Sequence, residues 1–127
     1  MEQLLSLRYV AVGGAIGTLV QWAALTIAEE DQAGETIFML NVAGAALFGI
    51  LLGLGAAPDR RRRVTENQMF LVGTGFCGGL TTVSTFALQA ATALDDGALS
   101  RAATIAAATM VFTVVSAGLG YRIGSRL

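Results

Sequence analysis

Four long stretches of this chain carry no charged residue, and the charged residues cluster in the short segments between them. The uncharged windows are residues 9–28, 36–57, 67–94 and 102–121. A helix rises about 1.5 Å per residue, so each window can cross a hydrocarbon core roughly 30 Å thick. None of the windows has the charged face that a helix of a soluble bundle shows to water. The pattern therefore predicts an all-α membrane protein, with a single four-helix transmembrane domain over residues 1–127.

Composition supports a lipid bilayer as the surroundings and narrows the chemistry. Of the 127 residues, 54% are hydrophobic and 13% charged, with no histidine, no lysine and one cysteine. No acidic residue lies within any of the four windows. The spans therefore hold no general base, and we expect a passive channel rather than an enzyme or pump. The same absence argues against a small multidrug transporter, which depends on a membrane-buried glutamate. The net charge of −1 favours no nucleic-acid partner.

Arginine is distributed unequally between the two sides of the predicted bundle. With four spans, the N-terminus, the second loop and the C-terminus share one side, which carries seven of the eight arginines: Arg8, Arg60, Arg61, Arg62, Arg63, Arg122 and Arg126. The other side carries Arg101 alone, beside several carboxylates. Positive residues near spans stay in the cytoplasm. We therefore predict a multi-pass protein of the cell membrane with both termini cytoplasmic.

The segment GTGFCGGLTTVSTF, residues 73–86, is the most informative part of the chain. Glycines within it are followed closely by four hydroxyl residues, Thr81, Thr82, Ser84 and Thr85. Glycine weakens a helix, so backbone carbonyls can become free there. Irregular backbone at membrane depth is tolerated where it is buried in protein or lines a polar cavity. We expect a break in the third helix and an ion site beside it.

Three amides lie well inside the predicted spans, away from their ends. Asn41 is in the middle of the second span, where an amide must find hydrogen-bond partners. Its side chain could either join two helices or line a pore as a donor, and the sequence leaves both open. Gln21 and Gln89 raise the same question, with a structural role favoured for each.

These motifs resemble the Fluc/CrcB family of fluoride channels over nearly the whole chain. Residues 75–86, GFCGGLTTVSTF, agree with the family's Gly-Phe-Cys-Gly-Gly-Leu-Thr-Thr-Phe-Ser-Thr-Phe at eleven of twelve positions. Further matches are Gly13, Gly14 and Gly17 in the first span, and Asn41 with Gly44 and Gly49 in the second. The predicted break in the third helix also fits this family.

The resemblance implies an architecture and a function. Two subunits of opposite orientation would pack as an antiparallel dimer, with their broken third helices meeting at the centre. Backbone carbonyls there, carried over to Gly78 and Thr81, would hold one sodium ion that is not transported. Fluoride would pass ring edges and polar donors and leave the cell passively, which reduces its toxicity in the cytoplasm. The matching pore positions are Asn41, Thr82, Val83, Ser84 and Phe86.

The chain departs from the family pattern at three positions. Val83 replaces a phenylalanine, Gln21 an arginine, and Met110 a tyrosine of the fourth helix. A polar stripe remains on that helix, at Thr109, Thr113 and Ser116. The losses weaken a pore built from this subunit alone, so a non-conducting structural subunit is the alternative to a conducting one.

The arginine bias bears on the partner. An antiparallel homodimer requires one sequence to insert in both orientations, whereas this distribution fixes one. We therefore favour a heterodimer with a related chain of the reverse bias, which could supply the missing pore groups.

Overall fold

The chain folds into helices that form four membrane-length spans. The computed structural model describes residues 2–29, 32–57 and 63–127. Three spans are continuous helices and one is interrupted; the elements are α1 (Glu2–Ile27), α2 (Ala33–Gly55), α3 (Glu66–Gln68), η3 (Met69–Cys77), α4 (Gly78–Leu80), α5 (Ser84–Asp95) and α6 (Leu99–Gly124). The third span, residues 66–95, runs from α3 through α5. The predicted all-α class, the four spans and the interruption of the third are confirmed.

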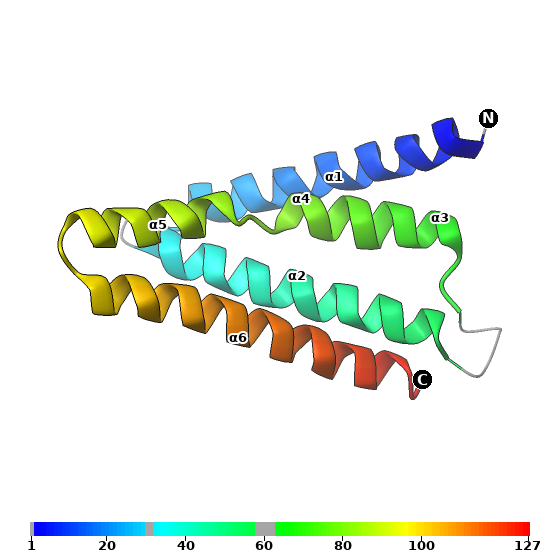
Figure 1. Ribbon diagram of the computed structural model, residues 1–127. Coiled ribbons are helices and arrows are strands. Elements are labelled where there is room, and N and C mark those ends of the chain that lie inside the picture. Colours follow the sequence, from blue (N-terminus) through cyan, green and yellow to red (C-terminus); the bar gives the residue numbers. More distant parts are fainter. Residues whose placement is uncertain (1, 30–31, 58–62) are drawn as a thin grey trace.

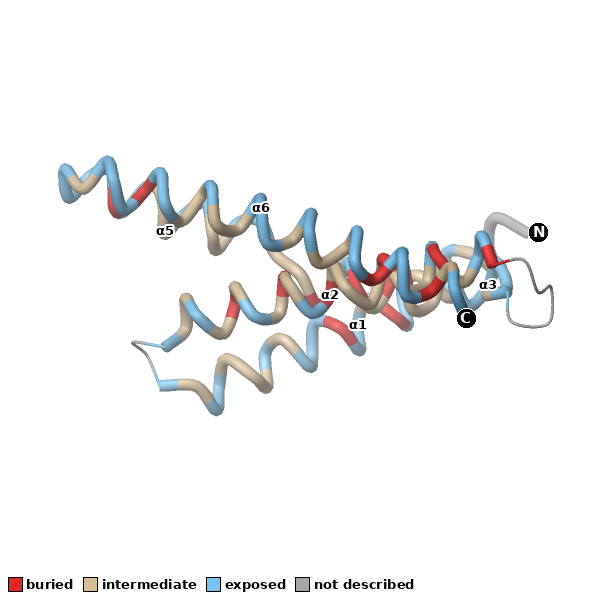
Figure 2. Tube along the Cα trace, turned by 90° about the horizontal axis from the view of Figure 1, so that it is seen from below, coloured by how far each residue is buried: buried red, intermediate tan, exposed pale blue. Residues whose placement is uncertain are grey.

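The helices run side by side, with the N- and C-termini at one end of the bundle (Figure 1). We call this the terminal end, and the opposite end, where α1 connects to α2 and α5 to α6, the loop end. α2 packs mainly on α6, and α1 mainly on η3 and α4. Towards the loop end, the α5–α6 pair diverges from the α1–α2 pair (Figure 2).

Glycines set the distance between α2 and α6. A Cβ at Gly49 would overlap the carbonyl oxygen of Ala117, and one at Gly120 would overlap that of Ala46. The same holds at Gly53 and Gly124, each against a backbone carbonyl of the other helix. In lipid, where there is no hydrophobic gain from helix association, such close backbone approach supplies the packing energy. The two helices are therefore joined along their terminal halves.

A second glycine contact joins α1 to the first part of the third span. A Cβ at Gly13 would overlap the carbonyl oxygen of Leu71, and one at Gly79 would overlap that of Gly14. A Cβ at Gly17 would likewise overlap the carbonyl oxygen of Phe76. These glycines are needed because neighbouring backbone occupies the space that a side chain would fill.

The interruption follows the glycines of the third span rather than lying among them. Gly73 and Gly75 belong to the π-helical segment η3, and Gly78 and Gly79 to the short helix α4. The irregular residues are Thr81–Val83, and Thr81 has extended backbone angles, φ −94° and ψ 149°. The expected break of the third helix is confirmed, and it lies just after Gly78 and Gly79 rather than at them. Gly79 is helical and packs against α1, and the irregular backbone begins two residues later, at Thr81.

Candidate ion site at the break of the third helix

The side chain of Asn41, in α2, forms two hydrogen bonds with the backbone of Thr82 in the break of the third helix. Its Nδ2 donates to the carbonyl oxygen of Thr82 at 2.9 Å, and its Oδ1 accepts from the backbone N–H of Thr82 at 2.8 Å. Asn41 is 6% exposed, so water cannot easily replace either bond. A backbone that leaves a helix at membrane depth must satisfy its polar groups within the protein. The amide of Asn41 supplies one donor and one acceptor to Thr82, and so stabilises the non-helical backbone.

This bridge leaves a carbonyl of α4 without its helical donor. In an unbroken helix, the N–H of Thr82 would bond to the carbonyl oxygen of Gly78; here it bonds to Asn41. Cys77 accepts from both the N–H and the hydroxyl of Thr81, at 3.0 and 2.9 Å. Thr18 donates to the carbonyl of Gly79 at 3.4 Å. Within the described parts of the chain, no hydrogen bond reaches the carbonyl oxygens of Gly78 and Thr81.

Gly78 differs from the packed glycines beside it. A Cβ at Gly78 would meet no atom within 4 Å, whereas one at Gly79 would meet the backbone of α1. The face of α4 that carries Gly78 is therefore open within the subunit. Any crowding by a larger residue at this position must come from outside the subunit.

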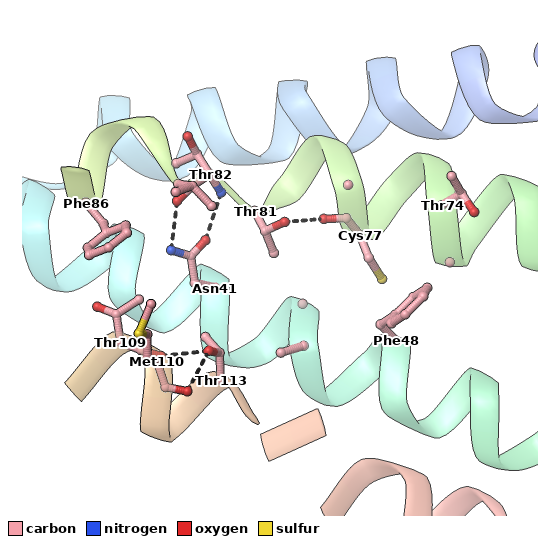
Figure 3. Close-up of a pocket in the computed structure, with 15 residues that line it drawn as sticks. Asn41, Phe48, Thr74, Cys77, Thr81, Thr82, Phe86, Thr109, Met110 and Thr113 are labelled. Atoms are coloured by element: carbon pink, nitrogen blue, oxygen red, sulfur yellow. Dashed lines mark hydrogen bonds between the residues drawn. The ribbon is translucent and has the colours of Figure 1, made fainter. Parts of the chain in front are cut away.

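An open groove of about 710 Å³ runs along the break and brings together most of the sequence-predicted site (Figure 3). Gly78, Thr81, Thr82, Val83 and Phe86 line it from the third span, and Asn41 lines it from α2. The rest of the lining comes from the same two spans and from α6: Gly44, Ala45, Phe48, Gly73, Thr74, Cys77, Thr109, Met110 and Thr113.

Few polar donors project into this largely apolar groove. The hydroxyls of Thr82 and Ser84 lie 2.9 Å apart and share one hydrogen bond, so one of their two protons remains available. Ser84 is exposed and lies outside the groove lining. Asn41 uses one of its two Nδ2 protons on Thr82, which leaves a second. The site can therefore offer N–H and O–H donors, but no charge, to an ion.

The three departures from the family pattern lie in different surroundings. Val83 lines the groove and is 71% exposed, and Met110 lines it from α6 and is 65% exposed. Gln21 of α1 is outside the groove, and its Nε2 is buried without a hydrogen-bond partner among the described residues. Two of the departures thus change an open surface, and the third leaves a buried donor unpaired.

The polar stripe of the fourth span divides between two roles. Thr109 and Thr113 line the groove, and the Thr113 hydroxyl donates to the carbonyl of Thr109 at 2.7 Å. Ser116 instead donates to the carbonyl of Val42 at 2.8 Å and so joins α6 to α2. The hydroxyl of Ser116 therefore serves a hydrogen bond between two helices and does not face the groove lining.

The groove residues that the sequence analysis did not single out include Phe48 and Thr74. Phe48 follows Asn41 by seven residues and therefore shares its face of α2. Thr74 precedes Thr81 by the same interval, along the irregular third span. The heptad spacing to a predicted site residue was the signal that could have found both.

Fold and site together define a class: a four-span membrane protein whose discontinuous helix places free backbone carbonyls and polar donors at membrane depth, as ion-conducting membrane proteins do. The comparison with known proteins is more specific. The family model described as "CrcB-like protein, Camphor Resistance (CrcB)" matches residues 8–121. The chain belongs to this family, as the sequence motifs predicted.

Curated relatives match nearly the whole length of the chain. One from Synechococcus sp. (strain CC9902), named fluoride-specific ion channel FluC 2, is 37% identical over 126 residues, which is 98% of this chain and 84% of the relative. The fluoride-specific ion channel FluC of Methylobacterium radiotolerans is 34% identical, with 91% of this chain and 82% of the relative covered. FluC 2 of Rhodococcus jostii is 32% identical, with 91% and 96% covered. Such proteins are ion channels and not enzymes.

Proposed function

We propose that this protein is a subunit of a fluoride channel of the cell membrane, through which fluoride leaves the cytoplasm passively. The observation that carries the proposal is the pairing of Asn41 with Thr82, which holds the third helix open beside a groove. Fluoride is a small, strongly hydrated anion, so it needs N–H and O–H donors to replace water. The spare protons of Asn41 and of the Thr82–Ser84 pair meet that need, and the ring edge of Phe86 adds a weakly positive surface.

A fluoride electrode tests this function directly. Liposomes loaded with fluoride and containing the chain with its partner should release fluoride when a potassium ionophore balances the charge. Chloride-loaded liposomes are the control for selectivity. Release no faster than from empty liposomes would reject the proposed function.

We further propose that Gly78 and Thr81 contribute main-chain oxygens to a structural sodium ion. Support comes from their carbonyls, which accept no hydrogen bond in the described part of the chain. The described residues also contain no group of three acidic, histidine or cysteine side chains that could hold a metal. A hard cation prefers oxygen ligands and takes about six of them, so two carbonyls require a second subunit to complete the site. When bound, the ion would neutralise these carbonyl dipoles at the centre of an antiparallel dimer.

The partner that we propose is a related chain of opposite orientation. The start of α1 and the C-terminal ends of α2 and α6 lie at the terminal end (Figure 1). Seven of the eight arginines occur in the sequence segments that adjoin these helix ends, and one adjoins the loop end. Such a bias favours one orientation, with both termini cytoplasmic. In this arrangement the partner's third helix would cover the open face at Gly78 and complete the groove.

A second candidate function is that of a non-conducting subunit which supports a pore in its partner. The specific observation in its favour is Val83, which is 71% exposed beside the groove where an aromatic ring would meet an anion. The two functions are separated by mutating each chain in turn. If Phe86→Ile in this chain has no effect, and only changes in the partner abolish flux, this subunit is structural.

A further inference from the structure

The groove continues past the break toward the terminal end, between α2 and the first part of the third span. Thr74 and Phe48 lie there, on the other side of the break from Phe86 (Figure 3). Apart from one threonine, the lining of this part consists of small and apolar residues: Gly44, Ala45, Phe48, Gly73, Thr74 and Cys77. The pore positions predicted from the sequence all lie at the break or on its loop side, so they leave this part of the groove without a donor.

The hydroxyl of Thr74 has no partner within the subunit. Other threonines of the spans donate their hydroxyl to the carbonyl four residues earlier, at 2.7–3.0 Å: Thr26, Thr81, Thr92, Thr104 and Thr113. Thr74 lies in the π-helical segment η3, and no hydrogen bond reaches its hydroxyl within the described parts of the chain. A hydroxyl in apolar surroundings without a hydrogen bond is destabilising. This hydroxyl therefore requires a partner from outside the subunit.

Thr74 faces the same open space as Gly78. The two residues are four positions apart, both line the groove and both are exposed in the isolated subunit. A Cβ at Gly78 would meet no atom within 4 Å, so no other part of the subunit covers this face. The third helix of the proposed partner would therefore close the groove over Thr74 as well, and separate its hydroxyl from lipid.

We propose that Thr74 is a further donor of the fluoride path, and that its hydroxyl binds the ion on the terminal side of the break. This inference rests on the proposed fluoride conduction. Thr74 precedes Thr81 by seven residues, which is about 10 Å along a helix. Over that distance Thr74 carries the one strong side-chain donor among the described lining residues, because the thiol of Cys77 donates weakly and that residue is 4% exposed. Fluoride that gives up water there needs this hydroxyl as a replacement.

The test compares Thr74→Val, which keeps the shape of the side chain without its hydroxyl, with Thr74→Ser, which keeps the hydroxyl. Fluoride release is measured with an electrode on liposomes that contain this chain together with its partner. Thr74→Val should lower the initial rate about tenfold or more, as expected for the loss of one hydrogen bond to a charged group. Thr74→Ser should retain most of the rate. Size-exclusion chromatography should show that both variants assemble with the partner as the unchanged chain does.

Thr104→Val is the matched control, because Thr104 is also an exposed threonine of a span but lies outside the groove and donates to the carbonyl of Ser100. It should leave the rate unchanged. An undiminished rate for Thr74→Val, or an equally low rate for Thr74→Ser, would overturn the inference. Loss of assembly in Thr74→Val would also overturn it, because the hydroxyl would then serve a contact between subunits. Absence of fluoride release from the unchanged chain would instead overturn the proposed function.

Discussion

Replacing Asn41 with leucine should destabilise the subunit more than any similar change to an amide elsewhere in its spans. Leucine has the same number and branching of side-chain heavy atoms as asparagine and suits lipid, but it offers no hydrogen bond. The N–H and the carbonyl of Thr82, bonded to Asn41 at 2.8 and 2.9 Å, would both lose their partner. Because Asn41 is buried, water is poorly placed to replace the amide.

The structure brackets the cost. If each bond has the average strength measured between membrane helices, about 0.6 kcal/mol, the total loss is about 1.2 kcal/mol. If both backbone groups remain buried and unpaired, at up to about 3 kcal/mol each, the loss reaches about 6 kcal/mol. Burial at 6% exposure favours the upper half of this range. We expect a loss of about 4 kcal/mol or more in the free energy of unfolding.

Titration with sodium dodecyl sulphate in mild-detergent micelles, followed by circular dichroism, measures this free energy. Gln21→Leu is the matched control, because the Nε2 of Gln21 is buried without a hydrogen-bond partner among the described residues, so its removal costs no hydrogen bond of that group. We expect that change to be neutral or stabilising. A loss below about 1 kcal/mol for Asn41→Leu, or equal losses for the two variants, would refute the role of Asn41 in holding the break.

Three further predictions concern the glycines, the groove and the topology. Gly79→Ala should cost about 1–3 kcal/mol of unfolding free energy, because its Cβ overlaps α1; Gly78→Ala should leave unfolding of the isolated subunit unchanged and weaken dimer formation in size-exclusion chromatography. Val83→Phe should raise fluoride flux from liposomes by lowering the barrier to conduction about 1 kcal/mol, and Phe86→Ile should reduce the flux. If neither change alters the flux, neither residue lines the fluoride path. Reporter fusions at Leu127 should give a signal from the cytoplasm only. Comparable signals from both sides of the membrane would show that the chain inserts in both orientations and would favour an antiparallel homodimer.

The site was predictable where its residues belong to one continuous motif. Gly78, Thr81, Thr82, Val83 and Phe86 lie within a few turns of each other, and all of them line one groove. Their roles in binding sodium and conducting fluoride remain predictions. Ser84 belongs to the same motif but lies outside the lining, because the helix restarts at this residue and its hydroxyl bonds to Thr82.

The hydrogen-bond partner of Asn41 was not predictable from the chain alone. The sequence left open whether its side chain joins two helices or lines a pore, and the partner, Thr82, is 41 residues away in the third span. The different surroundings of the glycines could not be predicted from the sequence either. Gly78 and Gly79 are adjacent and identical in type, yet one faces open space and the other the backbone of α1. Which direction each faces depends on the helix phase and on the neighbour that packs there.

The sequence by itself determined the four spans, because transfer of a charged residue into lipid is costly for every segment independently of its neighbours. It also determined the family, through a motif whose residues are contiguous. The tertiary structure decided where the third helix breaks. A backbone can leave a helix at membrane depth only where another element supplies hydrogen bonds, and here that element is α2, through Asn41. The position of the break thus depends on a contact between spans, which no local pattern contains.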